Sequence, residues 1–332
     1  GTQAQACASG RSKMETQPCG PVAKGSVYLV GAGPGAIGLL TVRAVEVLCA
    51  CDVVLYDRLV PMEIVRLANS KADVRSVGKD AGVSSDKMKG QQDNISKQLV
   101  ELALQGRSVC RLKGGDPMVF GRAGEEMAEL AGAGVPYEVV PAVTAALSAS
   151  ADACVPLTFR HVATSFRVLT MNSSTTQDEH FDWAQFTAPL TTFALYMGLS
   201  ALEGVCSRLL AVGVKSDTPM VVVDRASLPA MQVVEGTIST LPGVVREHQG
   251  PALEGPAMVL LGDVVSLRKR LVAPRPTPAA PADAALAVAL AALPQLDAAA
   301  LRLIQSRAQE LLGGLAAPEP TAQDETMKEA DA

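Results

Sequence analysis

The chain has 332 residues, of which 48% are hydrophobic and 19% charged, so it can bury a substantial core over about two domains. Aromatic residues make up 3%, and the net charge is −5, which together argue against a base-stacking nucleic-acid surface or a broad basic face for DNA or anionic lipid. Apolar runs are shorter than the roughly 20 residues that span a bilayer, and the seven cysteines show no Cys-x-x-Cys spacing. We therefore expect a globular protein with no nucleic-acid partner, no membrane span and no metal site.

The two ends of the chain differ in composition from the middle. Residues 1–25 lack a hydrophobic segment and are poor in acidic residues, which is typical of an organelle transit peptide or of a disordered tail. Residues 271–332 begin with a Pro/Ala-rich linker, continue through a short helix and end in an acidic tail. Between them we expect two α/β domains, residues 26–141 and 142–270.

From residue 26 onward, short β-rich runs alternate with segments of helical spacing. The first series predicts strands at 27–30, 53–56, 108–112 and 137–140, with helices at 39–51 and 124–133. Such alternation is typical of a mainly parallel sheet covered by helices. The second series predicts strands at 166–170, 192–196, 219–223 and 257–261, with a helix at 202–212.

The stretch VYLVGAGPG turns sharply after the first predicted strand. Gly31, Gly33 and Ala36 fit a loose G-x-G-x-x-G/A pattern, and Asp57 follows where a ribose-binding acid would lie in a dinucleotide-binding fold. Pro34, however, has no N–H to offer a phosphate. This stretch alone leaves NAD binding open as an alternative.

A second glycine-rich stretch, RLKGGDPMVFGRAGEE, follows another predicted strand. Gly114 and Gly115 let a ligand touch the backbone, and Asp116 places a carboxylate at the carboxyl end of the strand. Ligands of open α/β sheets bind at that edge, so the two glycine turns should converge on one crevice. A cationic ligand that carries an amino acid suits this pair of turns better than a pyrophosphate.

Eight sequence blocks together resemble the uroporphyrinogen-III C-methyltransferases of the tetrapyrrole methylase superfamily, over about residues 25–268. The blocks are VYLVGAGPG, DVVLYDRLV, SVGK, RLKGGDPMVFGR, VVPAVTAA, VPLTFRHVATSFR, YMGL and ALEGPAMVLLGDVVSLR. The resemblance implies two α/β domains with an active-site cleft between them and a homodimer. It also implies S-adenosylmethionine as the cofactor, with S-adenosylhomocysteine as its product, in place of NAD.

The same resemblance implies a reaction. The expected activity is C-methylation of uroporphyrinogen III at C2 and C7 to precorrin-2, for a sirohaem or cobalamin-type pathway. Two alternatives stay open: a paralogue that binds the cofactor or the tetrapyrrole but has lost turnover, and a sibling methylase that acts on a later precorrin.

The family's functional residues carry over by position. Asp57 matches the proton acceptor and Lys79 the proton donor. The implied cofactor-binding residues are Pro34, Gly114, Gly115, Asp116, Val119, Thr144, Ala145, Met197 and Ala226. Arg122 and Arg160 are candidates for the carboxylates of the substrate, because a guanidinium binds a carboxylate through two hydrogen bonds.

Four positions depart from the family pattern. Ala226 stands where the family usually has glycine, which is tolerable only at a negative φ. Ala142, in PAVT, should crowd a turn; Phe159, in PLTFR, removes a polar substrate contact unless His161 supplies it; and Asn172, in TMN, replaces a histidine. Most of these changes bear on the substrate side of the site.

The location of the protein is inferred from two short segments and the N-terminal extension. VATSFR and SDTP resemble plastid-type members of the family. We therefore expect the chloroplast stroma, with the cytoplasm as the alternative.

Overall fold

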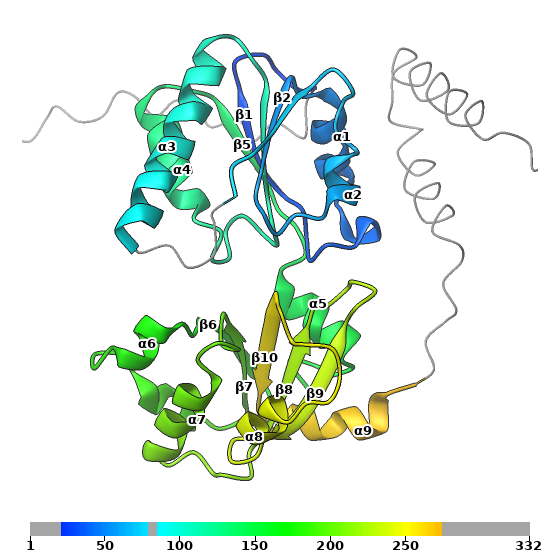
Figure 1. Ribbon diagram of the computed structural model, residues 1–332, viewed down its shortest axis with the longest axis vertical. Helices are drawn as coiled ribbons and strands as arrows, with labels where there is room; N and C mark the ends of the chain where they lie inside the picture. The colour runs from blue at the N-terminus through cyan, green and yellow to red at the C-terminus, as the bar shows by residue number, and fades with distance from the viewer. Residues whose placement is uncertain (1–20, 79–84, 274–332) are drawn as a thin grey trace, which may run out of the picture. The chain divides into compact units, whose positions relative to one another are not determined.

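The computed structural model describes residues 21–78 and 85–273, with the backbone alone for 85–91, 173 and 174. All described residues belong to one compact unit. Two five-stranded sheets follow each other along the chain (Figure 1). The first sheet uses β1 to β5 and the second uses β6 to β10.

The first sheet has the strand order β3-β2-β4-β1-β5, and every pairing in it is parallel. Its strands are β1 (Val27–Gly31), β2 (Val53–Tyr56), β3 (Asp73–Ser76), β4 (Val109–Lys113) and β5 (Tyr137–Val140). Its helices are the 3-10 turn η1 (Ile37–Leu39), α1 (Val42–Ala50), α2 (Met62–Val65), α3 (Ser85–Leu104) and α4 (Ala123–Gly132). The predicted parallel, helix-covered sheet is confirmed.

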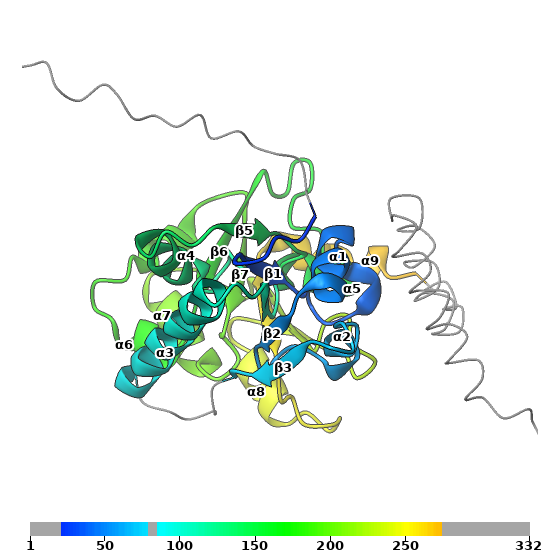
Figure 2. The same ribbon diagram turned by 90° about the horizontal axis from the view of Figure 1, so that it is seen from above.

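Alternate residues of β1 feed two separate cores, one on each face of the first sheet. Tyr28 and Val30 belong to the core beneath α1 and α2. Val27 and Leu29 belong to the core beneath α3 and α4. Figure 2 shows α3 and α4 on the opposite side of the strands from α1. Because both faces are covered, β1 is a continuous apolar run, as buried parallel strands usually are.

The second sheet is mixed. Its order is β6-β7-β10-β8-β9, with β6 parallel to β7 and the remaining neighbours antiparallel. The strands are β6 (Ser165–Thr170), β7 (Thr191–Tyr196), β8 (Pro219–Asp224), β9 (Gln232–Thr237) and β10 (Ala257–Leu261). The helices are α5 (Ala145–Asp152), α6 (Ser173–Gln177), η2 (Trp183–Thr187), α7 (Leu202–Ala211), α8 (Leu241–Arg246), η3 (Asp263–Leu267) and α9 (Arg268–Leu271).

The two faces of the second sheet are filled by different kinds of side chain. One face is aromatic: the ring of Phe186 stacks 5.8 Å from Trp183 and lies 4.6 Å from Phe193, measured between centroids. On the other face, alanines of α5 such as Ala146 and Ala149 pack with valine, leucine and methionine side chains. Because the alanine side chains are short, α5 can pack close to the sheet, directly after the chain has left the first one at β5.

Candidate functional site

The two glycine turns are hydrogen-bonded to each other. The Gly33 N–H donates to the Gly115 carbonyl at 3.1 Å, and the Gly115 N–H donates to the Gly33 carbonyl at 2.8 Å. Both residues have the left-handed φ that favours glycine, 67° and 69°. The expectation that these turns converge at the carboxyl edge of the first sheet is confirmed, and Pro34, Gly114 and Val119 lie in the same two turns.

Asp116 shapes this edge through the backbone. Its side chain is buried, and its two carboxylate oxygens accept the N–H groups of Met118, at 2.8 Å, and Ala142, at 2.9 Å. The carboxylate therefore ties the second glycine turn to the segment that crosses from β5 to α5. Its contact with a ligand stays a prediction.

Ala142 does not crowd its turn. A Cβ built on Gly31 would lie 2.5 Å from the Cβ of Ala142, so glycine at 31 leaves the room that Ala142 occupies. Ala142 is also not among the residues with positive φ. The expected steric conflict is therefore absent, and a close contact between β1 and the crossing segment takes its place.

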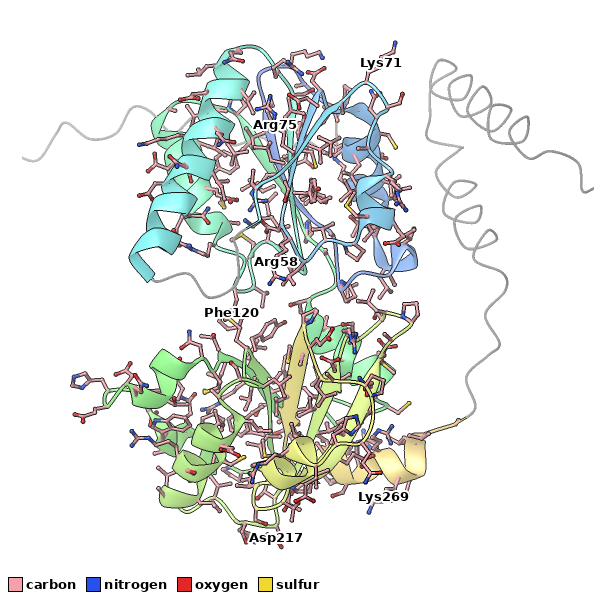
Figure 3. All side chains as sticks on the ribbon, viewed as in Figure 1. Arg58, Lys71, Arg75, Phe120, Asp217 and Lys269 are labelled. Atoms are coloured by element: carbon pink, nitrogen blue, oxygen red, sulfur yellow. The ribbon has the colours of Figure 1, made fainter. Side chains whose placement is uncertain are left out.

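The turn after β7 joins the same group of loops. The hydroxyls of Tyr196 and Thr144 are hydrogen-bonded, and the Tyr196 hydroxyl also accepts the Ala146 N–H at 3.1 Å. The ring of Phe120 lies 4.9 Å from that of Tyr196 (Figure 3). Met197, at φ 58° and half exposed, follows directly. Sequence reasoning missed Tyr196 and Phe120, although both stand inside motifs that it used.

In the loop after β8, the backbone at Ala226 avoids the positive φ that only glycine would tolerate easily. Arg225 and Ser227 have φ values of 50° and 65°, whereas Ala226 between them does not have a positive φ. Asp224, fully buried, accepts the Gly255 N–H at 2.7 Å and the Arg225 Nε at 2.9 Å. This loop and the segment after β1 line a cavity of about 350 Å³, formed by Ala36, Leu39, Asp152, Ser227, Leu228, Pro229 and Met231.

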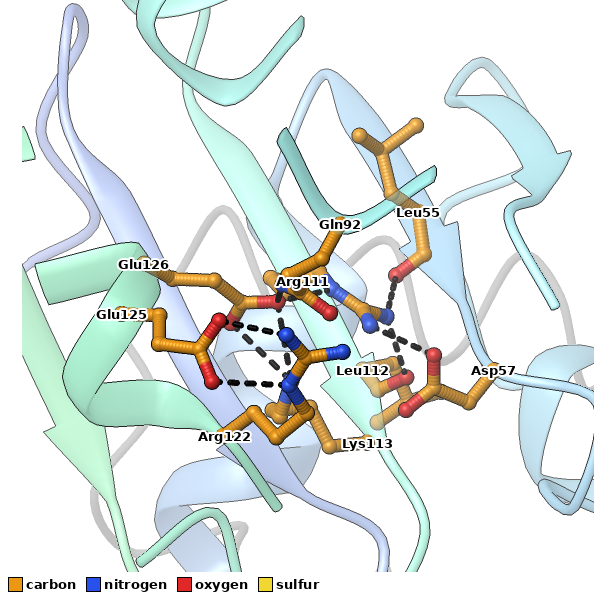
Figure 4. Close-up of polar contacts among 9 residues, drawn as sticks. All are labelled: Leu55, Asp57, Gln92, Arg111, Leu112, Lys113, Arg122, Glu125 and Glu126. Carbon is orange, nitrogen blue, oxygen red and sulfur yellow. Dashed lines mark hydrogen bonds and ion pairs between the residues drawn. The ribbon is translucent and has the colours of Figure 1, made fainter. Parts of the chain in front are cut away.

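Asp57 is the partly exposed end of a buried ionic network (Figure 4). One of its carboxylate oxygens, Oδ1, accepts a hydrogen bond from Arg111 Nη2, whose side chain is 2% exposed. Arg111 Nε donates to Glu126 at 3.1 Å, and Lys113 Nζ donates to both oxygens of Glu126 at 2.9 and 3.0 Å. Gln92 adds a hydrogen bond to Glu126 at 3.0 Å. The ionic partner of Asp57 is thus Arg111, a residue of β4.

The electrostatics of this network follow from burial and proximity. Burial lowers the pKa of Lys113, and the neighbouring Arg111 charge lowers it further. Burial also opposes the charge of Arg111, but Asp57 and Glu126 outweigh it and raise the pKa of its guanidinium. The network contains two cations and two carboxylates, so it is balanced in charge.

The sequence contains a sign of this buried network that the sequence analysis did not consider. Arg111 and Lys113 are charged residues in an otherwise apolar strand, VCRLK, and are spaced two apart. Side chains at this spacing lie on one face of a strand, here the face that α3 and α4 cover, where Glu126 and Gln92 meet them.

The two predicted substrate arginines differ in their surroundings. Arg122 has a φ of 58° just before α4, and its guanidinium donates to both oxygens of Glu125, at 2.8 and 2.6 Å. Arg160 is exposed, in a short hairpin closed by a bridge between Phe159 and Ala163, and within 21–78 and 85–273 no ion pair involves it.

Two further sequence-predicted positions have simple outcomes. Asn172 caps α6, because its side-chain oxygen accepts the Thr175 N–H at 2.9 Å. The helix cap thus gives a local structural reason for an asparagine at position 172, where the family has histidine. Lys79 lies outside the described residues.

The sequence and the fold were then compared with known proteins. Residues 26–242 match the family described as Tetrapyrrole (Corrin/Porphyrin) Methylases. Siroheme synthase of Acinetobacter baylyi is 43% identical over 248 residues, which are 75% of this chain and 52% of the relative. Siroheme synthase of Pseudomonas fluorescens SBW25 is 43% identical over 254 residues, 76% and 52% of the two chains. The chain thus spans about half the length of the curated relatives it matches.

Solved structures are similar over almost their whole length. Uroporphyrin-III-C-methyltransferase from Thermus thermophilus is 39% identical with a TM-score of 0.60, covering 75% of this chain and 97% of that one. A uroporphyrin-III C-methyl transferase from Thermus thermophilus complexed with S-adenyl homocysteine is 35% identical with a TM-score of 0.61, over 73% and 99%. A cobalt precorrin-4 methyltransferase is 27% identical with a TM-score of 0.62, over 73% and 96%.

The comparisons also bear on location. The curated relatives named above are bacterial, which gives no support to the chloroplast expectation. In the part of the chain that the structure describes, no helix combines the length and the apolar character needed to cross a bilayer.

Proposed function

Because this chain belongs to the tetrapyrrole (corrin/porphyrin) methylases, we propose that it transfers methyl groups from S-adenosylmethionine to C2 and C7 of uroporphyrinogen III, giving precorrin-2. The observation that carries the proposal is its 39% identity to a solved uroporphyrin-III-C-methyltransferase of which it covers 97%. Precorrin-2 would serve a sirohaem or cobalamin-type pathway. The proposal keeps the domain limits at residues 26–141 and 142–270, since the first sheet ends with β5 and α5 opens the second domain.

The glycine turns fit an S-adenosylmethionine site. A Cβ built on Gly115 would meet no atom of the described residues within 4 Å, its two chain neighbours apart, so these residues leave open space beside this backbone. Bound there, the cofactor would supply an electrophilic methyl group on a sulfonium. The residues that would hold it are Pro34, Gly114, Gly115, Asp116, Val119, Thr144, Ala145, Met197 and Ala226. Their task is alignment, which in favourable intramolecular reactions is worth about 7–11 kcal/mol of the barrier.

The position of Asp57 supports its assignment as the proton acceptor. Its backbone N–H bonds the Leu112 carbonyl at 3.0 Å, which sets the residue at the carboxyl edge of the first sheet. Its side chain is 31% exposed although its Oδ1 partner is buried. Methylation of a pyrrole carbon leaves a cationic ring, which must lose a proton from elsewhere on the macrocycle, and a carboxylate at this edge can take that proton. The proton-donor role of Lys79 rests on the resemblance.

Arg122 and Arg160 are proposed to bind substrate carboxylates. Both are accessible, and the pair of Arg122 with Glu125 is exposed on both sides, with 36% and 53% of the side chains open to solvent. Exposed pairs of this kind stabilise a protein by about 0.2–1 kcal/mol, so a substrate carboxylate can replace Glu125 at little cost.

The test is a labelled-methyl assay on the full chain. The protein is incubated with uroporphyrinogen III and methyl-labelled S-adenosylmethionine, and the label recovered in the tetrapyrrole is counted. Label transfer should occur in the wild type and collapse in Asp57→Ala, while calorimetry shows S-adenosylhomocysteine still bound. A protein that binds NAD and not S-adenosylhomocysteine would overturn the proposal.

Two outcomes would favour the alternatives. If the protein binds S-adenosylhomocysteine but transfers label neither to uroporphyrinogen III nor to any precorrin, it is a paralogue that has lost turnover. Transfer to a later precorrin but not to uroporphyrinogen III identifies a sibling methylase, for which the 27% identity to the precorrin-4 enzyme is the weaker observation. The family also implies a homodimer, which light scattering on the eluting protein tests.

A further inference from the structure

We propose that Arg111 is a positioning residue that clamps one oxygen of the Asp57 carboxylate and leaves the other open for proton transfer. The inference rests on the proposed function, because it assigns Asp57 the role of base. Oδ1 of Asp57 accepts the bond from Arg111, and Oδ2 has no hydrogen bond with any of the described residues. With 31% of the side chain exposed, Oδ2 is the oxygen that can meet a substrate.

Arg111 is itself immobilised by three other contacts. Its Nη1 donates to the backbone carbonyls of Leu55 and Leu112, each at 3.3 Å, and its Nε donates to Glu126 at 3.1 Å. These partners belong to β2, β4 and α4, so three elements fix the plane of the guanidinium. The planar fork of an arginine then transmits that orientation to Asp57.

Glu126 anchors the far side of the clamp. It is fully buried, and Lys113 Nζ holds both of its oxygens at 2.9 and 3.0 Å. Because Lys113 neutralises Glu126, the positive charge of Arg111 is left to face Asp57. Glu126 also lies in the first turn of α4, where the helix dipole favours a negative charge.

A purely structural role does not explain this arrangement well. Buried ion pairs cost so much desolvation that apolar residues of similar size often give equal or greater stability. Here a chain of buried charges leads from Glu126 through Arg111 to one partly exposed carboxylate at the edge where the glycine turns meet. Functional groups held by such supporting shells keep the geometry that their chemistry needs.

The experiment compares Arg111→Met and Arg111→Lys with the wild type in the labelled-methyl assay. Arg111→Met leaves Glu126 paired with Lys113 and Gln92, and leaves Asp57 partly in solvent, so the fold should persist. We expect kcat to fall roughly 10- to 100-fold, which is no more than the lower end of a general-base contribution because Asp57 itself remains, with KM and the S-adenosylhomocysteine Kd changed less than about threefold. Arg111→Lys should recover part of kcat, because it restores the cation without the fork.

A double variant separates positioning from a general structural effect. If Arg111 acts only through Asp57, then Arg111→Met in the Asp57→Ala background should cost nothing more, as expected for residues that act as a unit. The matched control is Arg43→Met, which removes an arginine whose side chain is 12% exposed and bonded to Glu138 at 2.7 and 2.9 Å, and should leave kcat within about twofold.

The outcomes are distinct. If Asp57→Ala loses turnover but Arg111→Met keeps wild-type kcat, or if the two losses multiply in the double variant, the positioning role is wrong and the proposed function stands. If Asp57→Ala itself keeps wild-type kcat, the assignment of the base fails and the clamp fails with it. Equal loss in Arg43→Met and Arg111→Met would also contradict the clamp.

Discussion

The two sheets differ in how they treat buried charge. The first sheet buries Arg111, Lys113 and Glu126 beneath its carboxyl edge, where they hold a side chain, Asp57. Among the described residues of the second sheet and its helices, Asp224 is the buried charged group, and it holds the backbone of a neighbouring loop through Gly255. In both cases the charge lies beside the candidate site. In the proposed function, the network of the first sheet supplies chemistry through Asp57, whereas Asp224, like Asp116 at the edge of the first sheet, shapes a loop through backbone N–H groups.

The largest effect should come from breaking the ionic network of the first sheet. Glu126→Gln leaves Arg111 and Lys113 buried with too little negative charge, and we expect a loss of about 3–5 kcal/mol in the free energy of unfolding by urea. The adjacent Glu125 is the control, since it is 53% exposed, and Glu125→Gln should cost less than about 1 kcal/mol. Equal losses in the two variants would contradict the contrast between them.

The corresponding change in the second sheet should cost less. Asp224→Asn weakens the bonds to the Gly255 N–H and Arg225, for which we expect a loss of about 1.5–3 kcal/mol in the free energy of unfolding. The S-adenosylhomocysteine Kd should rise as well, because the loop at Ala226 loosens. Asp217→Asn, at an exposed turn (Figure 3), is the control and should change neither quantity. If Asp224→Asn leaves the S-adenosylhomocysteine Kd unchanged, this loop does not shape the cofactor site.

The next largest loss of stability should come from a steric conflict at the carboxyl edge of the first sheet. In Gly31→Ala the new Cβ would lie 2.5 Å from the Ala142 Cβ and 2.7 Å from the Gly115 carbonyl oxygen. We expect a loss of about 1–3 kcal/mol in unfolding free energy, as in overpacked cores. Gly132→Ala lies at the exposed end of α4, where the new Cβ would meet no atom of the described residues within 4 Å beyond its own helix, and it should be neutral or slightly stabilising. A Gly31→Ala protein as stable as the wild type would show that the crossing segment yields easily.

The smallest effect should appear at the opposite edge of the same strands. Asp52 precedes β2, and the bond from Lys24, helped by the Ser108 N–H and hydroxyl at 2.8 and 2.7 Å, lowers its pKa from 3.8 to about 2. Because the folded pKa is depressed, the stabilisation is present above about pH 4 and is lost as the pH falls towards 2.

Asp52→Asn should therefore cost about 1 kcal/mol at pH 7, after allowance for solvent screening, and nothing near pH 2. Urea unfolding of both proteins across this pH range checks the convergence. A difference that stays constant with pH would mean that the Asp52 carboxylate contributes through packing and not through its charge.

The strands of the first sheet were predictable because burial on both faces makes each a short apolar run between polar turns. The predicted strands at 53–56 and 137–140 match β2 and β5, and the run at 27–30 is one residue short of β1. β3, β9 and the largely polar α3 were missed, since edge strands and polar helices carry little hydrophobic periodicity.

Local pattern thus decided where most buried strands begin and end, and which turns need glycine. Tertiary structure alone decided the partners of the polar side chains: Arg111 reaches Asp57 across 54 positions, Asp116 reaches the Ala142 N–H across 26, and Tyr196 reaches Thr144 across 52. Strand order explains the first of these, because β4 lies beside β2 although α3 separates them in the chain. A hydrogen bond depends on distance in space, and distance in sequence carries no record of that order.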